Sequence, residues 1–529
     1  MSPAASLKVA GAPRDALALG TLRALEGEPL ARFLSAQRWF GGKGQANLSP
    51  RFRDVIPLFT EEMDAVLARI DVPAHEGAVT TYQLPILAKL GGVDPADPTL
   101  LARIETSAGA GTLVDAAGDE AFRARLLRAL HGGEQWESGG LRWIAERTSD
   151  DLPAPETPSR VLGGEQSNTS ILYGERAMAK LYRRLAAGPN PEVEISEFLT
   201  RRGFPNIPAL LGLIRIRDAG GTETAAGVFQ EFVAAIGDGW TYARRRIREL
   251  MIATDAAPAG RAAFLADCRR LGEVTGGLHR ELAADATSEA FAPEPVTPED
   301  LARWATDLRR QVDRSLGLLE SSLASGRVEG PVAAEARAVL AQARPLGERA
   351  SAFLAGIQWT RGAAGAAGAK IRHHGDYHLG QVLRRPSGDF VILDFEGEPA
   401  RPLAERRRRH SPLRDVAGML RSFAYAVAAT LKDEPPGSSL ADCRSEAAVL
   451  SAAMRTVYLE AYFAAGPQAP ILPADAASRA GLLAVFEIEK VFYELAYELD
   501  NRPHWVDIPL GAVRALVGER MRDGADAHA

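Results

Sequence analysis

A polar segment at residues 373–397 holds the residues best suited to chemistry. Its sequence is HHGDYHLGQVLRRPSGDFVILDFEG, which contains Asp376, Gln381 and Asp394. An enzyme that transfers a phosphoryl group needs to form few or no covalent bonds itself. Catalysis depends on aligning the acceptor hydroxyl and on neutralising phosphate charge with metal ions. It therefore requires few carboxylates, provided that they are well placed. Asp376 and Asp394 offer two carboxylates, and Gln381 offers one carboxamide.

The spacing of these residues matches a phosphoryl-transfer loop. In such loops a base Asp precedes a metal-binding Asn by five positions, and a second metal-binding Asp begins the next motif. Here Gln381 stands five positions after Asp376, and Asp394 begins D-F-E-G. We predict that Asp376 orients the acceptor hydroxyl and takes its proton, and that Gln381 and Asp394 hold Mg²⁺.

Two other interpretations of the same segment exist. H-G-D alone can form a buried turn in which His374 and Asp376 bond to backbone groups. His374 and His378 have the i, i+4 spacing of a zinc pair on a helix. Gly375 and Gly380 favour a loop instead, so we expect His374 to brace the loop by hydrogen bonding.

A second half of a nucleotide site is predicted upstream. A flexible turn that covers the phosphates should precede a lysine on a strand. The turn is GGEQSNT at 163–169, and it is not a Walker A loop because no G-K-[ST] follows. The predicted nucleotide-binding residues are Gly164, Gln166, Ser167, Asn168 and Thr169 of the turn, the strand lysine Lys180, and Gln230, Glu231 and Val233 between the lobes.

The helix after this strand offers an acidic partner for Lys180. Asn190 is its predicted N-cap and Pro191 lies in its first turn. We prefer Glu194 as the catalytic partner of Lys180, although Glu192 can equally be a first-turn acid that interacts only with the helix dipole. The three candidates are Glu192, Glu194 and Glu197.

The elements that must position these residues change character along the chain. Residues 51–87 favour strands, and apolar residues at helical spacing (Phe122, Leu126, Leu127 and Leu130) predict a helix after them. The proline-rich stretch 151–160 interrupts this pattern. Strands and one helix are expected over 161–233, and long helices over 241–283 and 299–355.

This order predicts an α+β, bilobal, protein-kinase-like fold with a small β-rich lobe and a large helical lobe, preceded by an N-terminal β-rich cap. The expected domains are a cap and connecting region at 1–155, a small ATP-binding lobe at 156–233, and a helical lobe with the catalytic loop and acceptor site at 234–529.

Composition excludes several classes. The 529 residues are 46% hydrophobic and 25% charged, and the net charge of −6 gives no positive field for nucleic acid. Cys268 and Cys443 do not form a disulfide framework. The N-terminus lacks a signal-peptide pattern, and no apolar run approaches the ~20 residues of a membrane span. We expect a cytoplasmic protein with neither nucleic-acid nor membrane partners.

Several longer segments resemble one family. The chain looks like the aminoglycoside phosphotransferase-like kinases and, among them, closely resembles the maltokinases. RWFGGKG at 38–44 is similar to the start of that family's N-terminal cap. The segments that carry the resemblance are HGDYHLGQVL (374–383), LDFEGEP (393–399), PLAERRRRHSPLRDVAGMLRSF (402–423) and YELAYELDNRPHWVDIPL (493–510).

The resemblance implies ATP- and Mg²⁺-dependent phosphorylation of maltose at its anomeric hydroxyl, giving maltose 1-phosphate for α-glucan and glycogen synthesis. It also implies trehalose synthase as a metabolic neighbour or partner. Sugar recognition needs aromatic faces and polar side chains, although tyrosines at i, i+4 spacing also arise from core packing. The expected sugar-site residues are Asp376, His378, Glu396, Tyr493, Glu494, Tyr497, Asn501, Arg502 and Trp505.

Three alternatives complete the predictions. A kinase of the same fold can act on another sugar, such as glucosamine. A catalytically dead scaffold is disfavoured because Asp376, Asp394 and Lys180 are all present. The arginine run at 406–409 is interpreted as a solvated loop rather than an anion-steering patch. Arg414 and Asp415, like His279, are expected to be structural.

Overall fold

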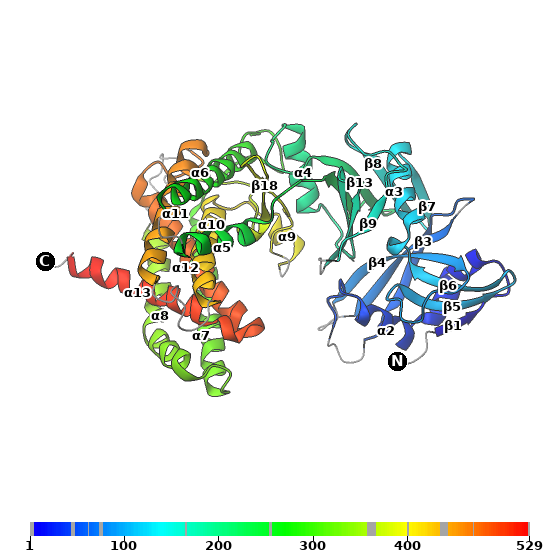
Figure 1. Cartoon of the computed structure of the whole chain (residues 1–529), viewed down its shortest axis with the longest axis horizontal. Coiled ribbons are helices and arrows are strands. Elements are labelled where there is room, and N and C mark those ends of the chain that lie inside the picture. The colour runs from blue at the N-terminus through cyan, green and yellow to red at the C-terminus, as the bar shows by residue number, and fades with distance from the viewer. Residues whose placement is uncertain are drawn as a thin grey trace. The chain divides into compact units, whose positions relative to one another are not determined.

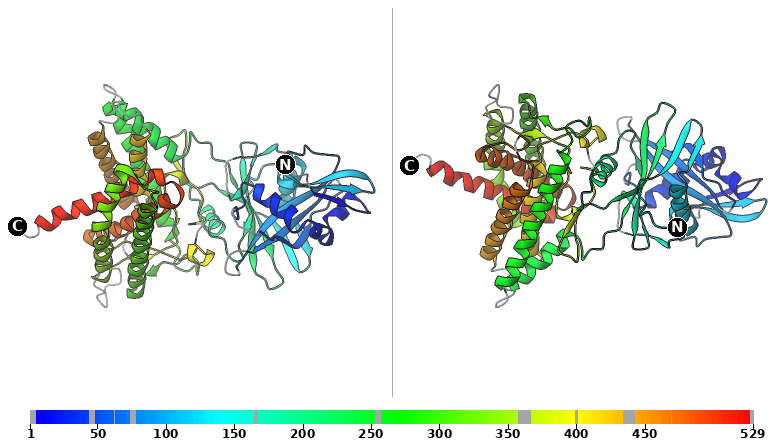
Figure 2. Two further views of the ribbon diagram at one scale, coloured as in Figure 1. Left: turned by 90° about the horizontal axis from the view of Figure 1, so that it is seen from below. Right: turned by 90° about the horizontal axis from the view of Figure 1, so that it is seen from above.

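The computed structural model forms two compact units (Figures 1 and 2). The first comprises Met1–Thr200 and Pro208–Ala234, and the second comprises Arg201–Ile207 and Ala235–Ala529. The structure describes residues 5–43, 48–61, 63–73, 78–163, 167–252, 257–356, 367–398, 401–433, 443–468 and 470–526.

The first unit begins with a mostly antiparallel sheet that forms the cap. Its strands lie in the order β1 (Ala5–Lys8), β5 (Leu100–Thr106), β6 (Gly109–Asp115), β4 (Val79–Leu90), β3 (Asp64–Pro73) and β2 (Arg51–Pro57), with β12 (Arg184–Leu185) also paired to β4. Strand β3 is buried on both faces. Val66 and Ala68 pack in a core with Phe33 of α2 (Glu28–Ala36), whereas Ala65 and Leu67 pack in a second core. This two-residue alternation is the period of a strand.

The second sheet of this unit is antiparallel. Its order is β7 (Gln135–Ser138), β8 (Leu141–Arg147), β13 (Leu210–Arg217), β14 (Glu223–Glu231), β11 (Ala177–Tyr182), β10 (Asn168–Tyr173) and β9 (Ser159–Val161). The helices of this region are α3 (Glu120–Gly132) and α4 (Pro191–Arg201). The predicted boundary near residue 155 therefore needs correction, because β7 and β8 pair into the sheet of the small lobe.

The cap and the small lobe share one core. The core that contains Ala65 and Leu67 of the cap also contains Ile171 and Phe229 of the second sheet. Gln83 Nε2 of β4 donates a hydrogen bond of 2.6 Å to the carbonyl oxygen of Ala226. The cap thus packs on the small lobe through buried apolar and polar contacts.

A buried arginine strengthens this junction. Arg183, between β11 and β12, is 1% exposed and donates through Nη2 to Asp115 Oδ2 at 2.7 Å. Its guanidinium also lies 4.7 Å from the centre of the Trp39 ring. Both partners belong to the cap, so the strand region that follows Lys180 is tied directly to it.

The second unit is mainly helical, as the apolar periodicity predicts (Figure 1). Helices α6 and α11 approach closely because Gly272 has no side chain: a Cβ there would lie 2.4 Å from the carbonyl oxygen of Tyr458. The helices are α5 (Gly239–Ile252), α6 (Ala257–Leu282), α7 (Pro298–Ala324), α8 (Gly330–Gly356), α9 (Leu403–Arg406), α10 (Leu413–Lys432), α11 (Arg444–Ala465), α12 (Ala476–Asn501) and α13 (Asp507–Asp526).

Two short strand pairs interrupt the helices of this unit. Strand β15 (Glu294–Pro295) pairs with β16 (Ala369–Lys370), and β17 (Val382–Arg384) pairs with β18 (Phe390–Ile392). The polar segment singled out in the sequence begins after β16 and ends after β18. One strand pair thus precedes this segment and the other forms a hairpin within it.

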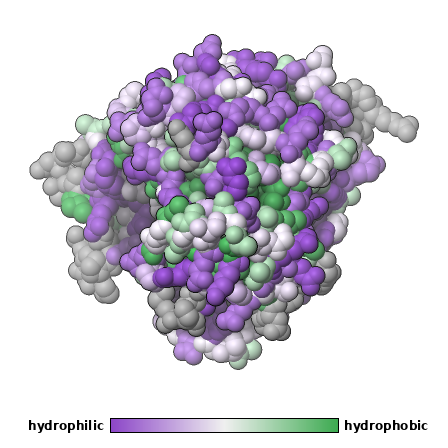
Figure 3. Space-filling view, turned by 90° about the vertical axis from the view of Figure 1, so that its right-hand side faces the viewer, coloured by the Kyte–Doolittle hydropathy of each residue, from purple (hydrophilic) through white to green (hydrophobic). Residues whose placement is uncertain are grey.

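The expected class, an α+β fold with a helical lobe and an N-terminal cap, is confirmed. Figure 3 shows one face of the molecule, on which hydrophilic residues predominate and hydrophobic residues form smaller groups. Among the described residues, no helix is both long and apolar enough to cross a bilayer.

Candidate active site

The catalytic loop is held by one buried carboxylate at the start of α10. Asp415 accepts hydrogen bonds from the backbone N–H groups of His374 (2.7 Å) and Gly375 (3.0 Å), and Nε2 of His279 lies 3.1 Å from it. Gly375 has φ +84°, a backbone conformation that glycine adopts readily and that is strained for residues with a Cβ atom. The structural roles expected for Asp415 and His279 are confirmed, and they fix the residue before Asp376.

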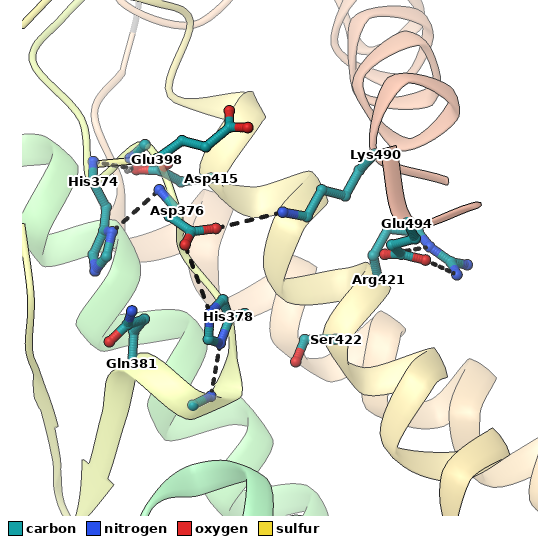
Figure 4. A network of polar contacts seen from close by, with 12 residues as sticks. His374, Asp376, His378, Gln381, Glu398, Asp415, Arg421, Ser422, Lys490 and Glu494 are labelled. Carbon is teal, nitrogen blue, oxygen red and sulfur yellow. Dashed lines mark hydrogen bonds and ion pairs between the residues drawn. The ribbon is translucent and has the colours of Figure 1, made fainter. Parts of the chain in front are cut away.

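His374 braces the loop, as predicted. Its Nε2 lies 2.8 Å from the carbonyl oxygen of Leu393, and its Nδ1 accepts from the N–H of Asp376 at 3.4 Å (Figure 4). His378 is the N-cap of the 3-10 helix at Leu379–Gln381, and its Nδ1 accepts from the N–H of Gly380 at 3.0 Å. With these ring nitrogens engaged in loop contacts, the geometry does not support the zinc alternative.

Asp376 faces a lysine that sequence analysis missed. Lys490 on α12 places Nζ 3.5 Å from Asp376 Oδ1, and His378 Nε2 lies 3.9 Å from Oδ2 (Figure 4). Burial alone would raise the pKa of Asp376. Lys490 and the neighbouring histidines lower it by more than burial raises it, so the pKa lies below its ordinary value. Asp376 is therefore an ionised hydrogen-bond acceptor at neutral pH. Burial also lowers the pKa of His378.

Gln381 and Asp394 come together as the predicted metal pair requires. Gln381 Nε2 donates to Asp394 Oδ2 at 3.2 Å, and the N–H of Leu393 donates to the carbonyl oxygen of Gln381 at 2.9 Å. Asp394 has φ +61° and is the one non-glycine among the described residues with positive φ. Strained backbone of this kind clusters at functional sites. A carboxylate beside a carboxamide is a hard oxygen donor set, which fits Mg²⁺.

Two hollows adjoin Asp376 in the helical unit. The smaller measures about 50 Å³ and the larger about 480 Å³, and both are lined by Asp376, Gly418, Lys490 and Tyr493. Charged side chains, among them Arg401 and Glu398, line the smaller one. The larger one has four aromatic residues in its wall, Trp240, Tyr425, Tyr493 and Tyr497.

Six of the predicted sugar-site residues line the larger hollow, and three do not. Asn501 is exposed and donates to the carbonyl oxygen of its own helix at Tyr497 (2.9 Å). Trp505 stacks on Tyr425 with ring centres 6.0 Å apart and planes at 7°, but does not line the hollow itself. Glu396 lines neither hollow, whereas Glu398 lines the smaller one. The six are Asp376, His378, Tyr493, Glu494, Tyr497 and Arg502.

Of the residues near Asp376 that the sequence analysis did not predict, only Lys490 could have been found from a local pattern. Lys490 precedes Tyr493 and Tyr497 at helical spacing, so it shares their face of α12. Trp240 and Tyr425 come from distant helices, and no local pattern connects them with the loop.

The residues predicted to bind the nucleotide phosphates lie in the first unit, where the predicted partner of Lys180 needs correction. Lys180 Nζ donates to Glu192 Oε1 at 2.7 Å, and the hydroxyl of Tyr182 donates to Glu192 Oε2 at 2.7 Å. Glu192 is fully buried, whereas Glu194 is partly exposed. Two residues along a helix differ by roughly 200° in direction, so both cannot face β11. The predicted cap is confirmed, because Asn190 Oδ1 accepts from the N–H of Glu192 at 2.8 Å.

The remaining predicted nucleotide residues fall in different settings. Gly164 and Gln166 lie outside the described residues. Ser167 is exposed, and Asn168 begins β10. Thr169 Oγ1 accepts from Arg183 Nε at 2.7 Å, which makes it part of the junction with the cap.

The residues of the connection also differ in exposure. Gln230 is buried and its Nε2 lies 3.4 Å from Ser196 Oγ, Glu231 is exposed, and Val233 is 8% exposed.

The turn predicted to cover the phosphates begins at Gly163. Arg38 of the cap donates through Nη1 to the carbonyl oxygen of Gly163 at 2.7 Å. The start of the turn is therefore held by the cap.

Comparisons with known proteins agree with this architecture. Residues 33–119 match the maltokinase N-terminal cap domain. A glucosamine kinase of Streptacidiphilus jiangxiensis is 29% identical over 378 residues, which cover 70% of this chain and 76% of that protein. A glucosamine kinase of Mycolicibacterium smegmatis (strain ATCC 700084 / mc(2)155) is 28% identical over 386 residues, or 72% of this chain and 82% of that protein.

Solved structures share the fold. A glucosamine kinase in complex with glucosamine, ADP and inorganic phosphate aligns with a TM-score of 0.63 at 20% identity, over 92% of this chain and 98% of that chain. A second crystal form, termed form B, aligns with a TM-score of 0.64 at 21% identity, over 89% and 94% of the two chains. The shared architecture thus includes both the cap and the helical lobe.

Proposed function

We propose that this chain, which is a maltokinase-like sugar kinase, phosphorylates maltose at its anomeric hydroxyl with ATP as the phosphoryl donor. The product, maltose 1-phosphate, would feed α-glucan and glycogen synthesis, and trehalose synthase would be a source of maltose and a partner. The observation that carries the proposal is the pair of hollows that meet at Asp376, one small and charged, the other larger and aromatic.

The larger hollow suits a second pyranose ring. At about 480 Å³ it leaves room for a ring beyond the one that meets Asp376. The rings of Tyr493 and Tyr497 lie 6.5 Å apart with planes at 20°, so the two rings form a nearly parallel pair along α12. Aromatic faces contact the apolar C–H faces of sugars while polar neighbours bond the hydroxyls. This combination favours a disaccharide over a monosaccharide.

Glucosamine, the substrate in the names of the relatives, is the second candidate, but the charges around Asp376 disfavour it. Recognition of an ammonium group needs an available carboxylate. Lys490 also places a positive charge directly beside the base, where a second cation would be repelled. Three of the carboxylates that line the hollows are paired with arginines: Glu398 with Arg401 at 2.5 Å, Glu489 with Arg414 at 2.6 Å, and Glu494 with Arg421 at 2.7 Å.

In the proposed reaction Asp376 holds the anomeric hydroxyl and accepts its proton as the bond to phosphorus forms. Lys490 keeps this carboxylate ionised and fixes its direction. Lys180, positioned by Glu192, would contact the nucleotide phosphates. Gln381 and Asp394 would hold Mg²⁺, which when bound neutralises phosphate charge.

The test is an ATP-consumption screen with maltose, glucose, glucosamine, maltotriose and trehalose. We expect maltose to give the highest kcat/KM. The Tyr497→Ala variant should raise the KM for maltose and leave that for glucose nearly unchanged, since only the second ring would meet Tyr497. Consumption with glucosamine but not with maltose would reassign the substrate while keeping the kinase.

A further inference from the structure

A third hollow shares no lining residue with the larger, aromatic hollow, and the proposed reaction does not use it. It measures about 60 Å³, enough for a few water molecules or one tetrahedral oxyanion. Its walls come from the segment 401–410, from the start of the catalytic loop at His373, and from Trp304 of α7. We name it the arginine pocket.

The arginine pocket is lined by more arginines than carboxylates. Its carboxylates are Asp307, Glu398 and Glu405. Burial lowers the pKa of His373 to about 4 and also lowers that of His410, so both rings are neutral and offer hydrogen bonds without charge. Three of the lining arginines also pair with carboxylates outside the lining: Arg303 with Asp300, Arg409 with Glu294, and Arg414 with Glu489. The lining arginines are Arg303, Arg401, Arg406, Arg408, Arg409 and Arg414.

Two buried polar atoms of its walls lack partners. His373 Nδ1 and Arg409 Nε are buried and make no hydrogen bond to the described residues. A buried polar group without a partner is costly, and in native proteins it usually marks a place for water or an ion. An oxyanion would supply acceptors for both groups. The exposed side chain of Arg408 also makes no ion pair within the described part of the chain.

The arginine pocket shares a wall with the acceptor site. Gly375, Glu398, Arg401 and Arg414 line both it and the smaller hollow beside Asp376. Arg401 and Arg414 hold Glu398 and Glu489, which face the acceptor. An anion that attracts these guanidinium groups would weaken their hold on the carboxylates. Gly375 is the residue immediately before the base, so the change would reach Asp376.

We propose that the arginine pocket binds a small tetrahedral oxyanion, either inorganic phosphate or the phosphate group of a monoester such as a sugar phosphate, and that its occupation raises the KM for the sugar acceptor. The proposal goes beyond the proposed function and holds for whichever sugar is the acceptor. It replaces the sequence-based expectation that the arginines at 406–409 form only a solvated loop.

Binding is tested by calorimetric titration of inorganic phosphate into the full chain saturated with a non-hydrolysable ATP analogue, at constant ionic strength set with chloride. The analogue occupies the nucleotide phosphate positions, so residual heat reports another site. We expect one phosphate per chain. The R408A/R409A double variant should bind roughly tenfold more weakly or worse, because charge-assisted hydrogen bonds are lost.

The matched control is R344A, which removes an exposed arginine of α8 that pairs with Glu320 at 3.4 Å. It should bind phosphate as the wild type does, and thermal unfolding of all three proteins checks that they fold. Titration with glucose 1-phosphate distinguishes the sources: tighter binding than phosphate identifies a monoester, and weaker binding identifies the free ion. Absence of saturable heat, or equal affinity in wild type and R408A/R409A, overturns the site.

The effect of phosphate binding on the acceptor site is measured separately, as a change in the KM for the sugar. Phosphate should raise the acceptor KM of the wild type several-fold, with little effect in R408A/R409A. An acceptor KM that stays constant while calorimetry shows bound phosphate would overturn the regulatory part of the proposal. Because binding is measured without turnover, an error in the assignment of maltose does not affect this test.

Discussion

The charge of Asp376 is set by the residues around it. Partial burial opposes ionisation, yet Lys490 approaches within 3.5 Å and lowers the pKa of the carboxyl group below its usual value. A carboxylate that stays ionised can orient a hydroxyl and receive its proton once phosphoryl transfer has begun. Lys490 thus lowers the pKa of Asp376 and also lines both hollows beside it.

Replacing Asp376 with Asn should lower kcat by about 10²- to 10⁴-fold, because the amide retains the shape but cannot accept the proton. The unfolding temperature should change little. Steady-state kinetics with the best acceptor measures the effect. D433N, which alters an exposed aspartate paired with Arg244, is the control and should keep wild-type rates. A D376N enzyme with more than a tenth of the wild-type kcat would exclude Asp376 as the base.

Replacing Lys490 with Met should move the acid limb of the kcat/KM profile to higher pH. The positive charge lowers the pKa of Asp376, so its removal allows that pKa to rise, and the base becomes protonated earlier as the pH falls. The profile is measured between pH 4 and 8. The control is K432M, which removes a lysine paired with Asp507 on the same unit and should leave the limb in place. An unchanged limb in K490M would show that Lys490 does not tune the base.

At the scale of elements, the phase of α4 against β11 decides which glutamate meets Lys180. Asn190 caps the helix and thereby sets its first turn. From that start Glu192 points inward and is buried between Lys180 and Tyr182, while Glu194 lies on a more exposed face. The pairing is therefore determined by the first residue of the helix.

E192Q should reduce kcat/KM for ATP roughly tenfold or more, because the hydrogen bond to Lys180 loses its charge. E194Q removes an acid two residues away on the same helix and should remain near wild type. ATP titrations at saturating acceptor compare the two variants. Equal losses in both, or a larger loss in E194Q, would contradict the pairing seen in the structure.

The sequence predicted features that depend on neighbouring residues better than features that depend on contacts between distant segments. Local signals predicted three features that the structure contains: Gln381 beside Asp394, the cap at Asn190 and the helix α3. Features that depend on tertiary packing were missed. The helix face of Glu192 and the membership of β7 and β8 in the second sheet depend on partners far away in sequence, which periodicity cannot identify.

At the scale of the molecule, the cap and the small lobe are joined by a charged pair inside a shared core. Arg183 and Asp115 have side chains only 2% and 6% exposed. Breaking such a pair leaves one charge buried without its counter-ion. The N-terminal region is therefore expected to contribute to the stability of the lobe that holds Lys180.

D115N should lower the free energy of unfolding of the first unit by about 3 kcal/mol, within the range measured for broken buried pairs. Chemical denaturation measures it. D150N removes an aspartate that is fully exposed and paired with Arg147, and should leave the stability close to that of the wild type. Equal stability of D115N and wild type would mean that the junction rests on apolar packing alone.

One feature of the chain path restricts how this architecture can evolve. The polypeptide leaves β11 in the second sheet and enters β12, which pairs with β4 of the first sheet at Arg184 opposite Tyr82. If two related genes recombined at a point between residues 90 and 184, β4 would come from one parent protein and β12 from the other. We therefore expect the exchange of caps between relatives to require matched substitutions in β4 and β12.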